Sequence, residues 1–240
     1  MIVNRELKVQ AKQIFKQHRI EFIVAAIAAL MVSIISQIPS NMITIPVYIQ
    51  QMNEIAMHGQ VFTVADPTAQ VAGMLAMIAI MAALYPVTVG YVKMALNGLN
   101  GHPVELNELG NHFRQLSRWA LLFVLVFAKT FLWSLLLLIP GIIAAINYSQ
   151  SVYLMLGDPD LKPNDAINQS IALMKGYRVD FFVLGLSFIG WLLLVVVTFG
   201  LAWLYVGPYM EITLAAFHRK LREINGAAIG DQPATVAPTL

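Results

Sequence analysis

The sequence lacks cysteine altogether and is poor in charged residues. No cysteine occurs among its 240 residues, which excludes disulfide bonds, thiolate metal ligands, a cysteine nucleophile and lipidation on cysteine. Charged residues make up 12% of the chain, against about 25% in soluble proteins. The net charge of +2 supplies no basic surface of the kind that binds nucleic acid.

Hydrophobic residues dominate the composition instead. They make up 58% of the chain, and between residues 20 and 217 no polar stretch is long enough to form a separate folded domain. This distribution predicts an integral membrane protein and argues against a soluble enzyme held by a single anchor.

Six apolar segments approach the roughly 20 residues that a helix needs to cross a bilayer. We therefore predict an all-α integral membrane protein with six transmembrane helices. They cover residues 20–38, 71–92, 119–139, 142–156, 181–198 and 201–217. The fourth is short, but Pro140-Gly141 before it and Phe199-Gly200 before the sixth are typical of tight hairpin turns at one face of the membrane.

The basic residues predict the orientation of these helices. Lys and Arg are retained on the cytoplasmic side, and fourteen of the fifteen lie at the N-terminus, in alternate loops or in the C-terminal tail. The long loop 39–70 and both hairpin turns have none. We therefore expect a multi-pass protein of the bacterial plasma membrane with both termini in the cytoplasm.

The chain divides into an N-terminal helix, a membrane domain and a tail. Residues 1–19 are expected to form an amphipathic cytoplasmic helix, residues 20–217 the membrane domain, and residues 218–240 a cytoplasmic tail that is disordered after residue 226. The first helix either lies in the headgroup layer, attracted to anionic inner-leaflet lipid, or is only the basic anchor of the first span.

Further short helices are expected between the spans. Those at 106–116 and 164–175 have apolar residues at helical spacing, and each precedes a pair of apolar segments. This order suggests three repeats of a short helix followed by a transmembrane hairpin. Residues 42–57 in the outer loop are apolar enough for an interfacial helix, a re-entrant segment or a partner surface.

Several sequence blocks carry a resemblance to a known family. They include Leu138-Ile139-Pro140-Gly141, Asp165-Ala166-Ile167 and Leu186-Ser187-Phe188-Ile189-Gly190-Trp191. The signature positions are Pro140, Gly141, Asp165, Ser170, Lys175, Gly176 and Trp191. The chain resembles a bacterial integral-membrane family, domain of unknown function nine-seven-five, and more distantly the membrane domain associated with glycerophosphodiester phosphodiesterases. The resemblance implies a multi-span plasma membrane protein and brings no activity or catalytic residues.

The spans contain one candidate polar site. Lys129 lies eleven residues before Pro140 and Glu211 eleven residues after Gly200, so both are about 16 Å from an outer turn, near mid-bilayer. Opposite charges at equal depth suggest a pair. Asn147, Gln150 and Ser151 add a polar face on the fourth span. These residues either line a pathway for an ion, a proton or a lipid headgroup, or hold helices together.

No catalytic motif accompanies this site. The five His residues are not at metal-ligand spacing, and no cofactor is expected. The sequence therefore favours an accessory or lipid-interacting protein of the cell envelope without catalytic apparatus. The alternatives are a small transporter or channel built on Lys129 and Glu211, and a membrane-embedded enzyme. Expected partners are membrane lipids, anionic inner-leaflet lipid among them, and a membrane protein or a second copy of the chain; nucleic acid is excluded.

Overall fold

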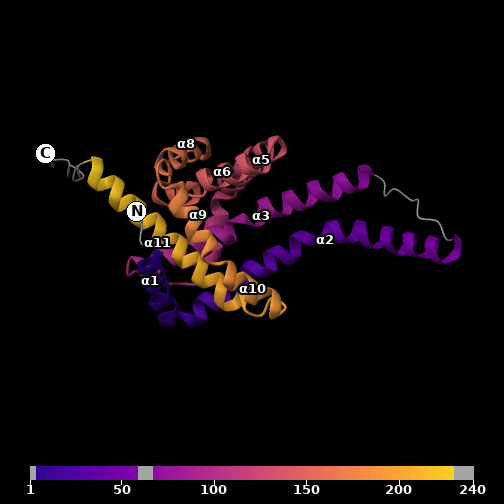
Figure 1. Ribbon diagram of the computed structural model, residues 1–240, viewed down its shortest axis with the longest axis horizontal. Coiled ribbons are helices and arrows are strands. Elements are labelled where there is room, and N and C mark those ends of the chain that lie inside the picture. Colours follow the sequence, from indigo (N-terminus) through magenta and orange to yellow (C-terminus); the bar gives the residue numbers. More distant parts are fainter. Residues whose placement is uncertain (1–3, 59–66, 230–240) are drawn as a thin grey trace.

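The computed structural model describes residues 4–58 and 67–229, and every regular element in these two ranges is a helix (Figure 1). In chain order they are α1 (Asn4–Gln17), α2 (Arg19–His58), α3 (Pro67–Leu99), α4 (Glu108–Asn111), the 3-10 helix η1 (His112–Gln115), α5 (Leu116–Leu136), α6 (Leu138–Tyr148), α7 (Ser151–Gly157), α8 (Pro163–Leu173), α9 (Arg178–Leu186), α10 (Ile189–Val197) and α11 (Trp203–Ile229). The all-α prediction is confirmed for the residues described.

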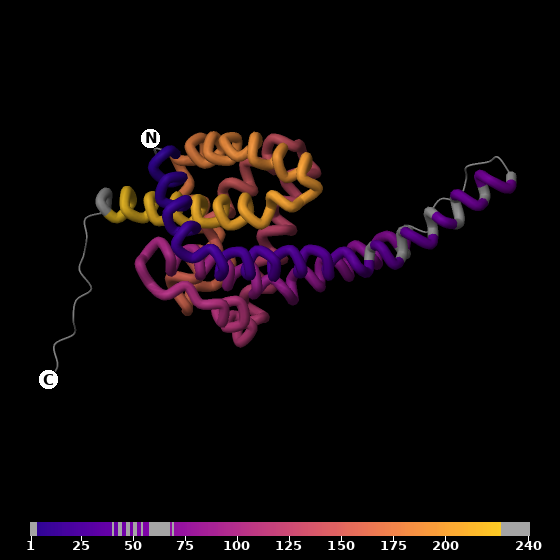
Figure 2. The backbone as a smooth tube through the Cα atoms, turned by 90° about the horizontal axis from the view of Figure 1, so that it is seen from below, coloured from indigo at the N-terminus to yellow at the C-terminus, as the bar shows by residue number. Residues whose placement is uncertain are grey.

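Helices α2 and α3 pack together as a long hairpin that extends away from the other helices (Figures 1 and 2). With 40 residues, α2 is about 60 Å long at 1.5 Å per residue. Residues 42–57 are helical, but they continue α2 rather than form a separate segment. The predicted outer loop 39–70 is therefore wrong over 39–58. Residues 59–66 lie outside the described part of the chain.

Two prolines in α2 explain that error. Pro39 and Pro46 lie inside the helix, and proline usually ends or kinks a helix because it lacks an N–H group and its ring crowds the preceding turn. α2 packs against α3 along the hairpin, and tertiary packing can override such a local preference against helix. The prolines therefore do not end α2.

Five helical segments within the described residues are long and apolar enough to cross a membrane. They are Arg19–Pro39, Gln70–Leu99, Glu108–Leu136, Leu138–Gly157 and Arg178–Val197. The fourth segment has 20 residues, which is enough to cross a bilayer. The predicted sixth span, 201–217, lies in α11, which is not among the five. α11 continues to Ile229, past residue 226 where disorder was expected, and residues 230–240 lie outside the described ranges.

The first hairpin turn lies three residues before the predicted Pro140-Gly141. Leu137 is extended, with φ −163° and ψ 151°, and separates α5 from α6. Pro140 is in the first turn of α6, where its missing N–H needs no helical partner. A Cβ at Gly141 would overlap Ser134 of α5, so this glycine permits close helix contact. The predicted boundaries at 139 and 142 are therefore wrong.

The second hairpin turn is confirmed at Phe199-Gly200. These residues have φ of 50° and 90°, the left-handed region that favours glycine. The span predicted as one helix over 181–198 is interrupted between α9 and α10. There the Ser187 hydroxyl donates to the carbonyl oxygen of Leu184, a local bond that competes with the helical pattern.

The apolar core is built around α11, and α1 packs along that helix (Figure 2). Leu7, Ala11 and Phe15 of α1 are buried, and Phe15 meets the ring of Tyr205 edge-on at 5.2 Å. The apolar stripe of the N-terminal helix therefore faces protein. This corrects the interpretation that the stripe rests in the lipid headgroup layer.

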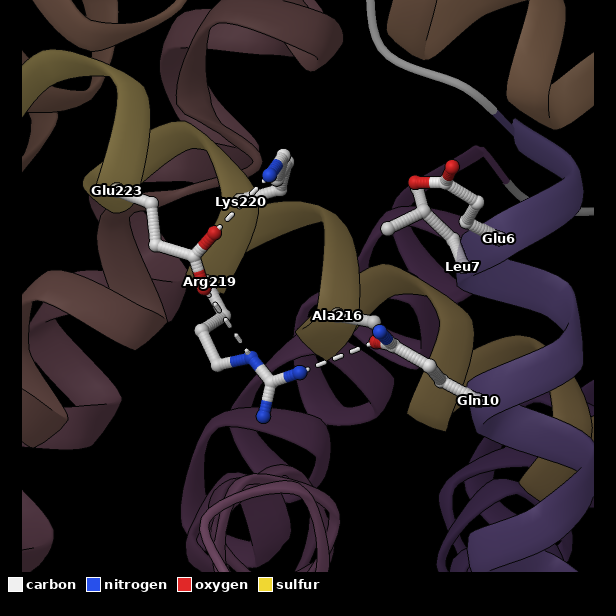
Figure 3. Close-up of a pocket in the computed structure, with 7 residues that line it drawn as sticks. All are labelled: Glu6, Leu7, Gln10, Ala216, Arg219, Lys220 and Glu223. Carbon is white, nitrogen blue, oxygen red and sulfur yellow. Dashed lines mark hydrogen bonds and ion pairs between the residues drawn. The ribbon is translucent and has the colours of Figure 1, made fainter.

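Polar contacts of Arg219 also join α11 to α1 and α3. Arg219 of α11 donates to Gln10 Oε1 at 3.1 Å, while Lys220 lies 3.1 Å from Glu223 (Figure 3). Arg219 also donates to the carbonyl oxygen of Leu99 at the end of α3. One guanidinium thus joins α1, α3 and α11.

Candidate functional site

Two side-chain contacts, one partly buried and one buried, join α7 to α11. The Tyr153 hydroxyl donates to Glu211 Oε1 at 3.3 Å, and Gln150 Oε1 lies 3.0 Å from His218 Nδ1. The rings of Tyr153 and His218 stack with centroids 4.8 Å apart and planes 14° from parallel. An amide oxygen only accepts, so this geometry assigns the proton to His218 Nδ1. We call Gln150, Tyr153, Glu211 and His218 the polar cluster.

A serine of α8 closes the interruption between α6 and α7. The helices stop and restart at Ser149 and Gln150, which leaves backbone groups without helical partners. The Ser170 hydroxyl donates to the Asn147 carbonyl at 2.5 Å and accepts from the Gln150 N–H at 3.1 Å. Because buried backbone groups need such partners, Ser170 allows the interruption to be buried beside the polar cluster.

A cavity of about 400 Å³ adjoins this interruption, between α3, α5, α6 and α7. It is lined by Tyr85, Phe123, Val126, Phe127, Thr130, Ala145, Tyr148, Ser149, Ser151 and Val152. Its volume lies in the range of about 300–1,000 Å³ that ligand sites occupy. Phe127 and Ala145 are exposed, so the cavity opens on the outer surface of the helix bundle.

Two hydroxyl groups in the cavity wall have no hydrogen-bond partner in the described part of the chain. They are Thr130 Oγ1 and Ser151 Oγ, both buried. A buried hydroxyl without a partner costs about 1–3 kcal/mol, and both oxygens are enclosed by protein atoms rather than open to the cavity. None of the described residues that line the cavity is charged. The cavity therefore suits an apolar chain.

Aromatic side chains form one wall of the cavity. Phe123 and Phe127 line the cavity, and Phe131 continues their row outside it, because the three are spaced four residues apart on one face of α5. Their ring centroids are 6.1 and 6.0 Å apart, with interplanar angles of 18° and 6°. Tyr85 of α3 contacts Phe123 at 5.2 Å. This wall offers flat apolar surfaces to an elongated hydrocarbon.

The structure does not bring Lys129 and Glu211 together. Lys129 Nζ donates to Asn164 Oδ1 at 2.8 Å, whereas Glu211 accepts from Tyr153. The ion pairs of the described residues do not include either side chain. Equal distance from two turns predicts equal depth, but it does not predict the direction in which each side chain leaves its helix. The predicted pairing is thereby corrected.

The other three predicted polar residues lie near one another at the α6–α7 interruption. Gln150 belongs to the polar cluster, and Ser151 lines the cavity. Asn147 contributes its carbonyl oxygen to Ser170, and its buried Oδ1 has no partner among the described residues. Within the predicted site, Gln150 and Glu211 therefore share the polar cluster, while Lys129 belongs to a separate contact with α8.

The family-signature positions have structural roles outside the cavity. Gly176, with φ 91°, follows α8 in the left-handed conformation that ends many helices. Trp191 packs against Tyr205 and Tyr209 at 5.7 and 5.8 Å. Asp165 and Lys175 are exposed near the two ends of α8. With the roles of Pro140, Gly141 and Ser170 given above, these positions shape helix ends and helix contacts.

Tyr153 and His218 were not predicted as site residues, although the sequence contains a signal for them. Glu211 and His218 are seven residues apart, and Gln150 and Tyr153 are three apart. Both spacings place two side chains on one helix face. A polar pair on each of two apolar helices therefore indicates a contact between those helices. Pairing residues by opposite charge alone does not predict it.

The fold and the site define a class of protein: an all-helical bundle of membrane-type helices with an apolar cavity that opens on its outer surface. Within residues 4–58 and 67–229, no group of three potential ligand side chains could hold a metal ion. The chain belongs to a family of unknown function, because residues 71–225 match the family model described as Protein of unknown function (DUF975). No curated protein and no solved structure matches the chain.

The match confirms the resemblance to family nine-seven-five that the signature blocks indicated. The more distant likeness to a phosphodiesterase-associated membrane domain gains no support from it and stays a prediction. The family assigns no activity, so the function has to be inferred from the geometry of the cavity and the polar cluster.

Proposed function

We propose that this protein is a six-span protein of the bacterial plasma membrane, with both termini in the cytoplasm, that binds a membrane lipid in the cavity and has no catalytic role. The distribution of basic residues supports the orientation. The sixth crossing would be made by α11.

Burial supports α11 as a span despite its polar residues. Val206, Ile212 and Phe217 are fully buried, and Glu211 has a buried partner in Tyr153. Polar residues in membrane helices face the interior of the bundle, where protein groups can satisfy them. A helix enclosed by neighbours therefore does not need an apolar surface all round.

The cavity is the observation that carries the lipid proposal. It opens at the exposed residues Phe127 and Ala145 on α5 and α6, two helices that also expose many large apolar side chains. Such an opening would face the lipid chains of the bilayer.

The polar cluster supports a role without catalysis. Gln150, Tyr153, Glu211 and His218 bond to one another, and none of them lines the cavity. A catalytic group has to reach the reacting atoms of its substrate. The cluster would therefore hold α7 against α11 and fix the cavity wall. Anionic inner-leaflet lipid would contact the basic residues of the cytoplasmic face.

The test compares lipid retention in two variants of α6. Ala145→Phe adds a ring at the mouth of the cavity. Ile143→Phe is the matched control, because Ile143 is 43% exposed on the same helix and does not line the cavity. Protein would be purified from native membranes in mild detergent, and bound lipid counted by native mass spectrometry.

We expect Ala145→Phe to retain at least fivefold less lipid than the unaltered protein, and Ile143→Phe to retain as much. Thermal unfolding of both variants should stay near that of the unaltered protein, which excludes loss of lipid through unfolding. Equal lipid retention in all three proteins would contradict a lipid site in the cavity.

A small transporter is the second candidate, and Glu211 is the observation that favours it. This buried carboxylate has a tyrosine hydroxyl as its partner and no cation in an ion pair. Intramembrane acids of this kind often mark ion or proton routes. If the protein is a transporter, Glu211→Gln should fold normally but fail to complement a deletion strain, whereas a lipid-binding protein should tolerate the change.

A further inference from the structure

Between Met31 and Met52, α2 has an apolar stripe that no element of the described chain covers. Seven large apolar residues occur at alternating spacings of four and three positions. They are Met31, Ile35, Ile38, Met42, Ile45, Ile49 and Met52. All seven are between 44% and 72% exposed. We call this set the seam.

The spacing of the seam is that of a coiled coil. Apolar residues that recur every three and four positions form one continuous line when two helices wind around each other. The seam keeps this alternating spacing of four and three residues over three heptads. An α-helix that faces only lipid has no reason to keep a register, because lipid chains accept apolar side chains on every face.

The length of α2 places part of the seam beyond the bilayer. The helix is about 60 Å long, about twice the roughly 30 Å of the hydrocarbon layer. Counted from Arg19, the first residue of α2, about 20 residues cross that layer, so Met42, Ile45, Ile49 and Met52 follow it. The hairpin projects away from the other helices at this point (Figures 1 and 2). Exposed apolar residues in water call for a partner.

Charge and symmetry favour one partner. From residue 22 to residue 53 the chain has no charged side chain, so two copies of the seam would meet without repulsion. All copies of a membrane protein share one orientation, so two α2 helices would run parallel and each seam residue would face its own counterpart across a two-fold axis. We infer that the protein forms a parallel homodimer through the α2 seam. The inference rests on the proposed topology but not on the lipid cavity.

The test uses single cysteines, which the chain lacks. Ile45→Cys and Met52→Cys place a thiol on the seam. Met57→Cys is the control: Met57 is 78% exposed but points away from the seam, because it lies five residues after Met52 and each residue turns the helix by about 100°. Each variant would be oxidised in native membranes and examined for a dimer of twice 26.5 kDa.

We expect more than half of the chains to crosslink at Ile45→Cys and Met52→Cys, and fewer than a tenth at Met57→Cys. Adding Ile49→Lys should reduce crosslinking at Met52→Cys at least fivefold, since it places two like charges face to face. No crosslinking at the seam, equal crosslinking at all three positions, or a product with a different protein would each overturn the homodimer.

Discussion

Replacing Ser170 with alanine tests how the α6–α7 interruption is held. Ser170 is fully buried, and its hydroxyl satisfies both the Asn147 carbonyl and the Gln150 N–H. Each stranded backbone group costs about 1–3 kcal/mol, so Ser170→Ala, which strands two, should destabilise the protein by about 2–6 kcal/mol. At about 2–4 °C per kcal/mol for a chain of this size, the unfolding midpoint should fall by at least about 4 °C.

Ser36 provides the matched control. It is also buried, at 1% exposure, but its hydroxyl donates only to the carbonyl of Ser33 in the same helix. That carbonyl lies inside α2, so Ser36→Ala should cost no more than about 1 kcal/mol. The assay is thermal unfolding in detergent, followed by the fluorescence of the four tryptophans. Equal midpoints for the two variants would refute the role assigned to Ser170.

Three further substitutions test particular contacts by the same assay. Gly90→Ala should destabilise the protein by about 1–3 kcal/mol, because a Cβ there would overlap the backbone of Glu108 and Leu109. Gly185→Ala faces open space and should be neutral or stabilising. Equal effects of the two substitutions would contradict this packing. Tyr153→Phe should lower the free energy of unfolding by about 1–3 kcal/mol, because Glu211 loses its hydrogen-bond donor. An unchanged unfolding midpoint would show that the Tyr153–Glu211 hydrogen bond does not contribute to stability. The stability losses of Lys129→Met and Glu211→Gln should add within about 0.5 kcal/mol in the double variant, because the two side chains share no partner. A double variant more stable than this sum would show that the two residues do pair.

Composition and hydropathy were sufficient to predict the all-helical fold and the approximate position of five spans. They could not place helix ends, because those depend on side chains from other elements. Pro140-Gly141 has the composition of a turn, yet Gly141 permits contact with Ser134 and the turn lies at Leu137. The continuation of α2 past Pro46 was missed for a related reason: packing against α3 overrides the local preference of proline against helix.

The candidate site was predictable in part. Gln150, Ser151 and Glu211 were found because polar residues are rare in apolar spans. Their partners were not found, because hydropathy contains no information on which helix faces which. The cavity depends on the shape of four packed helices, and Phe123, Phe127 and Tyr85 are ordinary residues in a membrane span when read singly. Only their arrangement identifies them as a wall.

Both proposals depend on the six-span topology, and cysteine labelling in intact cells tests it most directly. Single cysteines replace Gln60, Lys162 and Thr235 in a chain that has none of its own, and a membrane-impermeant maleimide is applied. We expect labelling at Gln60→Cys in intact cells, and at Lys162→Cys and Thr235→Cys only after permeabilisation. If α11 does not cross the membrane, Thr235→Cys will be labelled in intact cells while Lys162→Cys is protected, and that result would contradict the six-span arrangement.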